Sequence, residues 1–449
     1  MKKLLYFAAF AALSLTACSS TEDEIFDQSA AERLESYKQE YADVLTSDGG
    51  LWSMEYFSND EEPGYVFVVK FDKNGSVAIS ANHKWIGGEF KQEVSLWKMI
   101  ADNGPVLSFN SYNSLFHIFS DPANIEGPYA PKGDDGTTDV DETGFGHEGD
   151  YEFQVMNVSE DGSTVRLLGK KRMYDIYLHR LDASTDARQY LEDVAAVPSK
   201  FSSRFNDMTM TDEDGNLYRV YDLYTAIPSI YPLAGDAVMQ TVSGNGIFTL
   251  DGFRFMEPLL VKKADDSEFE VTKLYFNENG TLSGQNVADL RSISPLENLI
   301  RQDLTWTIDA GSLTGKVKSM YDQANEAIVA ALSEKDKLGA IDFAYASVTG
   351  VITSQLVTRL GSRICRDYIE YAVEYDEQGN VIPSDQLCFD FSGGNNTSLR
   401  YDEEIPAYKA FKDYLASGFV MTVNNQLIPD VITLTDKNDS SSSFNLKVK

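Results

Sequence analysis

Short apolar segments of strand length alternate along this chain with polar turns that contain glycine. In five of these turns Asp, Asn or Ser opens a polar run that reaches Gly three residues later, between β-branched or aromatic residues. The five turns lie in residues 71–77, 158–165, 211–217, 276–282 and 375–381. Such turns reverse antiparallel strands, because glycine adopts the left-handed conformation that the turn requires. The pattern therefore predicts a mainly β fold with helices, of the α+β class, whose strands meander.

Eight runs in the first half of the chain have the composition of strands. They lie at residues 51–57, 65–71, 76–81, 89–97, 106–109, 151–158, 164–169 and 173–181. Eight strands is the number that closes a small barrel. Trp52 in the first run, the hairpin at Gly75 and the run after Tyr174 resemble lipocalin-like domains, which implies an antiparallel barrel that holds a ligand. A filled barrel or a curved sheet without a cavity is the alternative.

Helical signals divide the chain into domains. Ser29 and Glu32 form a capping box that opens a helix, and Gly49-Gly50 stops it. A second helix at about 186–196 ends before Pro198. The expected parts are a helix plus barrel-like domain over 29–183, a helical joint over 184–200 and a second β-rich domain over 201–449.

The second domain is expected to mix strands with helices. Apolar residues recur at helical spacing over 312–335, which predicts a long amphipathic helix, and a shorter helix is predicted over 406–415. Trp306 opens a run like the one that contains Trp52. This similarity hints at an old duplication, which a single tryptophan does not establish.

The first residues of the chain predict export and lipidation. Lys2 and Lys3 precede an apolar run over 4–15 that is too short to span a bilayer but suits a signal peptide of residues 1–17. The sequence from Leu15 to Cys18 resembles the lipobox of bacterial lipoproteins, which implies cleavage before Cys18 and acylation of this residue. The expected partner is then a lipid membrane, bound through acylated Cys18. An ordinary signal peptide with an incidental cysteine is the alternative.

An acidic segment follows the cysteine and narrows the expected location. Residues 18–28 are polar, with Glu22-Asp23-Glu24 near the start, and predict a solvated tether. The segment resembles the surface-export signal of Bacteroidota lipoproteins, which implies the outer face of the outer membrane. The periplasmic face is the alternative.

Net charge excludes one class of function. The 449 residues include 70 acidic and 38 basic side chains, for a formal net charge of −32. Such a chain repels phosphate backbones, so we expect no nucleic-acid partner. The acidity otherwise favours solubility.

Four further motifs carry a family resemblance. They lie in residues 26–34, 52–57, 101–107 and 149–153. With the export signal, they resemble the Bacteroidota surface lipoproteins grouped as family 4302 of the domains of unknown function. This resemblance implies an uncharacterised surface lipoprotein beside outer-membrane nutrient-uptake proteins. The family offers no established catalytic residues to carry over.

One acidic loop has the spacing of a calcium site. Oxygen donors at positions one, three, five, seven and twelve of an EF-hand loop would be Asp139, Asp141, Thr143, Phe145 and Asp150. The position after Phe145 lacks its usual apolar residue, the last ligand is not Glu, and no helix flanks the loop. A disordered acidic loop is the main alternative, and no other cofactor is expected.

Catalytic residues are not identifiable from the sequence. His147-Glu148 lacks the second His that a helical zinc motif needs four residues later. The remaining histidines are far apart, and each is interpreted as a lone strand or surface residue. Paired carboxylates for glycoside hydrolysis could come from almost any two of the 70 acids.

Two cysteines remain beyond Cys18. Cys365 and Cys388 flank the turn that contains Gly379, and strand pairing across this turn would place Cys365 opposite about Asp390. A bulge would bring the two sulfurs within disulfide reach. A disulfide and two buried thiols are the alternatives.

The leading functional hypothesis is a non-catalytic binding or accessory lipoprotein of a nutrient-uptake system, with an unknown ligand. A hydrolase of glycan or peptide is the second hypothesis, and a structural or adhesive surface protein is the third. A deep pocket would favour binding, whereas a cleft with two convergent carboxylates would favour hydrolysis.

Overall fold

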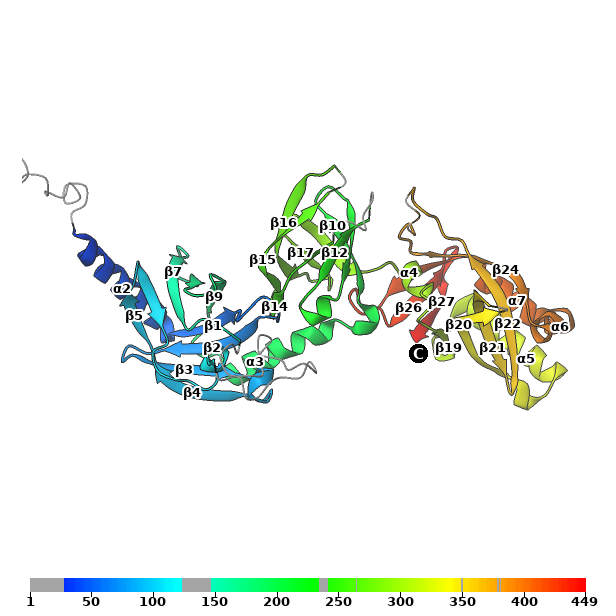
Figure 1. The fold of residues 1–449 in the computed structure, drawn as a ribbon. Coiled ribbons are helices and arrows are strands. Elements are labelled where there is room, and N and C mark those ends of the chain that lie inside the picture. Colours follow the sequence, from blue (N-terminus) through cyan, green and yellow to red (C-terminus); the bar gives the residue numbers. More distant parts are fainter. Residues whose placement is uncertain are drawn as a thin grey trace, which may run out of the picture. The chain divides into compact units, whose positions relative to one another are not determined.

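Three antiparallel sheets form the protein in the computed structural model (Figure 1). The structure describes residues 28–122, 147–233, 241–263, 265–348, 350–377, 379 and 381–449. It contains two compact units, one ending at Ala195 and the other running from Ala196 to Lys449. The first unit holds one sheet and the second unit holds two. The predicted β-rich α+β class is confirmed.

The first unit contains a curled sheet with one helix before it and most of a second helix, α3 (Ala187–Ala196), after it. Helix α2 (Ala30–Thr46) begins at the predicted capping box of Ser29 and Glu32. The strands are β1 (Leu51–Tyr56), β2 (Tyr65–Phe71), β3 (Ser76–Ala81), β4 (Lys91–Leu96), β5 (Lys98–Ala101), β6 (Pro105–Ser108), β7 (Glu152–Val158), β8 (Thr164–Gly169) and β9 (Asp175–Arg180). Their order is β4-β3-β2-β1-β9-β8-β7-β6-β5. The two strands at the ends of this order, β4 and β5, are separated in the chain by Trp97 alone. The sheet therefore curls so that its first and last strands follow each other directly in the chain.

The second unit begins after α3 (Ala187–Ala196) with a sheet of the same strand order. Its strands are β10 (Asp207–Asp212), β11 (Leu217–Tyr221), β12 (Ser229–Pro232), β13 (Val242–Ser243), β14 (Gly246–Thr249), β15 (Gly252–Lys262), β16 (Glu268–Phe276), β17 (Leu282–Gly284) and β18 (Val287–Ser292). The first strand, β10, pairs with both the next strand and the last, as β1 does in the first sheet.

The third sheet has a related but not identical order, β23-β25-β26-β27-β19-β20-β21-β22-β24, and adds helices. Its strands are β19 (Trp306–Asp309), β20 (Leu338–Val348), β21 (Val351–Leu360), β22 (Arg363–Tyr371), β23 (Gln386–Leu387), β24 (Phe389–Gly394), β25 (Phe419–Val423), β26 (Val431–Asp436) and β27 (Asp439–Val448). The helices are α4 (Pro295–Leu299), α5 (Gly315–Ala331), α6 (Asn396–Glu404) and α7 (Pro406–Leu415). The first strand again pairs with the next and the last. The second half, predicted as one mixed domain, thus contains two sheets with separate cores.

Trp52 and Trp306 are similar in their structural surroundings as well as in their sequence context. Both indoles are fully buried in the first strand of their sheet. The indole Nε1 of Trp52 donates to the Leu45 carbonyl of α2 at 2.9 Å, and that of Trp306 donates to the Asn298 carbonyl of α4 at 3.1 Å. Each tryptophan therefore anchors the preceding helix to its sheet.

All five predicted turns are present. Their glycines, at positions 75, 162, 215, 280 and 379, have φ angles of 86°, 69°, 87°, 83° and 84°. Each donates its N–H to the carbonyl of the residue that opens the turn, three positions earlier. The residue types in these five segments were therefore sufficient to locate the turns at which the chain reverses direction.

The disulfide hypothesis for Cys365 and Cys388 is wrong. Both cysteines are free, with Cys365 buried and Cys388 exposed. The chain returns through the predicted turn, but Gln386 and Leu387 then pair with β25 instead of β22. Pairing with β22 resumes only at Phe389, so the carbonyl of Cys388 accepts the N–H of Ala372, far along the strand from Cys365. Because Gln386 and Leu387 pair with β25, the register between β22 and β24 is displaced by more than a β-bulge could correct.

Candidate functional site

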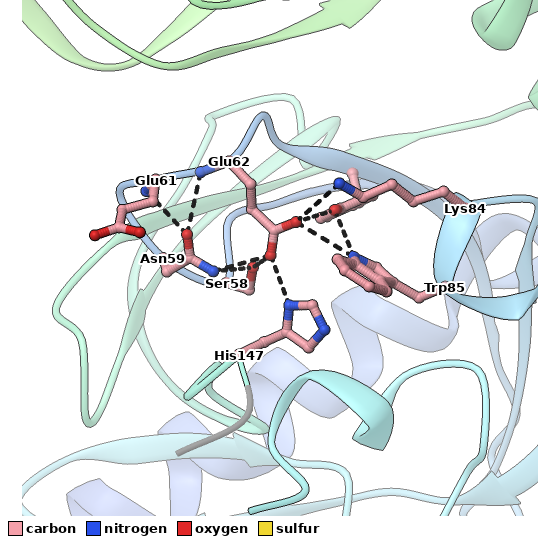
Figure 2. A network of polar contacts seen from close by, with 8 residues as sticks. Ser58, Asn59, Glu61, Glu62, Lys84, Trp85 and His147 are labelled. Carbon is pink, nitrogen blue, oxygen red and sulfur yellow. Dashed lines mark hydrogen bonds and ion pairs between the residues drawn. The ribbon is translucent and has the colours of Figure 1, made fainter. Parts of the chain in front are cut away.

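A polar network occupies one end of the first sheet (Figure 2). It forms where β1 ends and β2 begins, because these strands are antiparallel and Tyr56 lies opposite Tyr65. The loop between them supplies Glu62, the segment after β3 supplies Trp85, and His147 precedes β7. Antiparallel pairing thus gathers residues from three distant parts of the chain.

Glu62 is the centre of this network and is only 5% exposed. One carboxylate oxygen accepts from His147 Nδ1 at 2.7 Å. The other donors are Ser58 Oγ at 3.0 Å, Asn59 Nδ2 at 2.9 Å, Trp85 Nε1 at 3.2 Å and the Tyr65 hydroxyl, with Lys84 Nζ at 3.5 Å. A buried carboxylate with this many donors is fully satisfied and held in one orientation.

These hydrogen bonds determine which groups of the network are ionised at neutral pH. Burial alone would raise the pKa of Glu62, but the hydrogen bonds from His147 and Tyr65 outweigh it and lower this pKa to about 2. Burial and the adjacent Glu62 carboxylate both raise the pKa of Tyr65, so its hydroxyl keeps the proton that it donates. Glu62 is therefore ionised at neutral pH and cannot act there as a general acid.

His147 is completely buried, and its second ring nitrogen is uncommitted. Its Nδ1 bonds to Glu62, whereas Nε2 has no hydrogen-bond partner among the described residues. The ring packs edge-on against Trp85 and Phe119, with centroid distances of 4.3 and 5.2 Å. A carboxylate on Nδ1 fixes the tautomer in which Nε2 is an acceptor, as in general bases and metal ligands. Within the described ranges, no group of three or more His, Cys, Asp or Glu side chains could hold a metal ion.

Two further histidines, His83 and His117, are buried and lie outside the strands, so neither is the lone strand or surface residue that the sequence predicts. His83 donates from Nε2 to the Leu115 carbonyl at 2.9 Å, and its ring contacts Phe119 at 4.9 Å. His117 bonds through Nε2 to the Phe109 carbonyl at 3.0 Å. His83 contacts the short helix η3 (His117–Phe119), and His117 belongs to this helix. The spacing of the histidines in the sequence does not predict that they come together there.

Aromatic side chains fill the interior beside the network. Phe116 and Phe119 are buried against Tyr56, with ring centroids 5.1 and 5.4 Å from it. The Tyr56 hydroxyl donates to the Asp150 carbonyl at 3.1 Å. A Cβ on Gly149 would lie 2.0 Å from this hydroxyl oxygen, so only glycine fits there. Aromatic side chains therefore pack the interior of the first sheet at this end.

Burial of His83 predicts a pH dependence of stability. Burial lowers the pKa of His83 from 6.5 to about 4. The unfolded state therefore binds the proton first, and the free energy of unfolding should fall by about 3 kcal/mol as the pH falls from 6.5 to 4. His83→Gln retains a donor for Leu115 but does not titrate. In urea titrations, this variant should lose about 3 kcal/mol less than the wild type over that window. Equal losses in both proteins would contradict the expectation.

The second unit contains a cleft of about 670 Å³ that is lined by both polar and apolar residues. It lies between residues of the second and third sheets, both within this unit. Six of its lining side chains carry hydroxyl groups: Thr209, Thr211, Ser292, Ser294, Ser384 and Thr422. Gln426, Arg291 and Asp385 add an amide, a cation and the single carboxylate among the described lining residues. The volume is in the range of small-molecule sites.

The structure describes few of the sequence-predicted site residues. Cys18 lies outside the described residues, as do Asp139, Asp141, Thr143 and Phe145, so acylation and calcium binding stay predictions. Asp150 is described, and its carboxylate accepts the backbone N–H groups of Lys171 at 2.6 Å and Arg172 at 2.9 Å. These bonds hold the segment before β7 to the turn between β8 and β9.

Comparison with models of protein families gives a match to this chain. A family model described as Domain of unknown function (DUF4302) matches residues 22–273, more than half of the chain. No curated protein matches the sequence. None of the described helices is long and apolar enough to cross a membrane.

Proposed function

We propose a binding function for this chain, which belongs to the family described as Domain of unknown function (DUF4302). In this proposal the protein is a lipoprotein that captures a polar ligand at the bacterial surface, as an accessory component of a nutrient-uptake system. The cleft in the second unit is the observation that carries the proposal.

The chemistry of the cleft suits binding better than hydrolysis. Hydroxyl and amide side chains both donate and accept hydrogen bonds, so they match ligands that carry many hydroxyl or amide groups. Glycoside hydrolysis needs two carboxyl groups on either side of the scissile bond, whereas Asp385 is the single carboxylate among the described lining residues. The hydrolase hypothesis is therefore second.

Anchoring at the outer face of the outer membrane is the second part of the proposal. The lipobox resemblance at Cys18 and the acidic residues after it support this location, and the chain leaves the anchor through a short tether before α2. A lipocalin-like origin of the first sheet is also proposed. The antiparallel order of its strands and its curled form support this origin.

Filling the cleft should abolish ligand binding. Thr422 is exposed on β25 and lines the cleft, so Thr422→Trp adds bulk there without disturbing the core. Thr272 on β16 is an exposed strand threonine that does not line the cleft, and Thr272→Trp is the matched control. We expect calorimetry of the full chain against oligosaccharides and peptides to show binding by one class, weakened about tenfold or more only in Thr422→Trp.

Two outcomes would contradict this proposal. Turnover of the bound oligosaccharide or peptide, detected as shortened products, would support the hydrolase hypothesis instead. Equal binding by wild type and Thr422→Trp would place the ligand elsewhere on the protein.

A further inference from the structure

A buried lysine contacts two carboxylates in the third sheet. Lys412 of α7 places Nζ 2.6 Å from Asp367 Oδ1 on β22 and 2.7 Å from Asp402 Oδ1 on α6. The side chains of Lys412 and Asp367 are only 2% and 3% exposed. Helix α6 carries Asp402 and packs against both β22 and α7, the elements that carry the other two groups (Figure 1).

The surroundings of Lys412 are aromatic. Its Nζ lies 5.6 Å from the ring centre of Phe391 and 4.8 Å from that of Tyr408. One ammonium cannot neutralise two carboxylates, so the cluster carries an excess negative charge in a poorly solvated site. Burial disfavours such a charge and favours uptake of a proton by one carboxyl group. In agreement, burial raises the pKa of Asp367 despite the opposing effect of Lys412.

We propose that Lys412 and Asp367 condense to an isopeptide bond. A proton first passes from the Lys412 ammonium to Oδ2 of the Asp367 carboxylate, which gives a neutral amine and a carboxylic acid. The amine then attacks Cγ of Asp367, a new C–N bond forms, and the C–Oδ2 bond breaks. One amine proton moves to Oδ2, which leaves as water. No electrons are gained or lost, and no co-reactant is needed.

Neighbouring groups can assist each step of this condensation. Asp402, at 2.7 Å from Nζ, can accept the amine proton and deliver it to the leaving oxygen. Ser398 Oγ donates to Asp367 Oδ1 and would stabilise the negative charge that develops there. Asp367 Oδ2 is buried and has no hydrogen-bond partner among the described residues, so no such bond holds the leaving oxygen. Burial holds the reacting atoms in contact, which raises their effective concentration.

A bond between these residues would join α7 to β22. The two positions are 45 residues apart in the chain, so the link would close a loop that contains β23, β24 and α6. Closing a loop of this kind restricts the unfolded chain and stabilises the fold.

Peptide mapping of the full chain tests this proposal. We expect a proteolytic digest of the denatured protein to contain the Lys412 and Asp367 peptides joined, with a mass one water below their sum. Lys409 and Asp413 on the same helix are also 2.6 Å apart but half-exposed, and they serve as the internal control that should stay unlinked. Lys412→Met should abolish the linked species, and Asp402→Asn should reduce it.

The wild-type digest decides the question without any variant. Recovery of both unlinked peptides, with no species lighter by one water, would overturn the proposal and leave an ordinary buried ion pair. A water loss at Lys409–Asp413 as well would also overturn it, because the exposed pair lacks the burial on which the reaction depends.

Discussion

Replacing Glu62 with alanine should lower the free energy of unfolding of the first unit by about 3–5 kcal/mol. The substitution removes the acceptor shared by His147, Trp85 and the neighbouring donors. Buried donors without an acceptor bear the full cost of their lost hydration. Because His147 is completely buried, water cannot replace the carboxylate without opening the structure.

Tryptophan fluorescence during urea unfolding can measure this loss. Three of the four tryptophans lie in the first unit, so a Trp306→Phe background restricts the signal to that unit. Glu61→Ala is the matched control, since Glu61 is exposed and its carboxylate points away from the network (Figure 2). The control should change stability by less than about 0.5 kcal/mol. Equal effects of Glu61→Ala and Glu62→Ala would show that the network contributes nothing specific.

The effect of Glu62 should also depend on pH. The pKa of Glu62 is lowered from 4.5 to about 2, so its contribution is fully present above pH 4.5 and is lost as the pH falls toward 2. The stability difference between wild type and Glu62→Ala should therefore shrink across this window. A constant difference would contradict the charged hydrogen-bonded state of Glu62.

Trp52→Ala and Trp306→Ala should each cost about 3–5 kcal/mol, but in different sheets. Each change leaves a large cavity and an unpaired carbonyl at the end of the preceding helix, at Leu45 or Asn298. In the first sheet, Arg180 also loses the ring on which it stacks. We therefore expect Trp52→Ala to destabilise α2 as well as its sheet, and Trp306→Ala to destabilise α4 as well as its sheet.

Hydrogen exchange with mass spectrometry can localise both effects. Trp52→Ala should reduce amide protection in β1, β2 and β9, whereas Trp306→Ala should do so in β19, β20 and β27. The two variants serve as controls for each other because the residues lie in separate units. Loss of protection in all three sheets from either change would show that the protein unfolds as one cooperative body.

Local chemistry explains which elements could be predicted from the sequence. Turns such as the one at Gly75 depend on residues within a few positions, and the flanking strands alternate apolar and polar residues. Strand β21 is harder to recognise, because the polar residues Gln355 and Thr358 are buried and the sequence does not alternate like that of a half-buried strand. Strand β10 likewise buries the polar residues Thr209 and Asp212.

The candidate site could not be predicted because its members are distant in the chain. Glu62 and His147 are 85 residues apart, and nothing near Glu62 distinguishes it from Glu61. The buried pair of Lys412 and Asp367 has the same property. The capping box of α2 shows the opposite case, because Ser29 and Glu32 are three residues apart and carry their own signal. Predicting which charged residues pair across long distances in the chain requires the register of the sheet, and local sequence patterns do not give that register.

The circular strand order limits how other chains can attach to this protein. Long unpaired strands at the end of a sheet invite strand addition and aggregation. Here the terminal strands are short, six and four residues in β4 and β5, two and four in β13 and β14, and two and six in β23 and β24. Little backbone is thus left to template a neighbouring chain by strand addition. A chain that attaches to the described part of the protein would therefore have to recognise side chains, on loops or in the cleft.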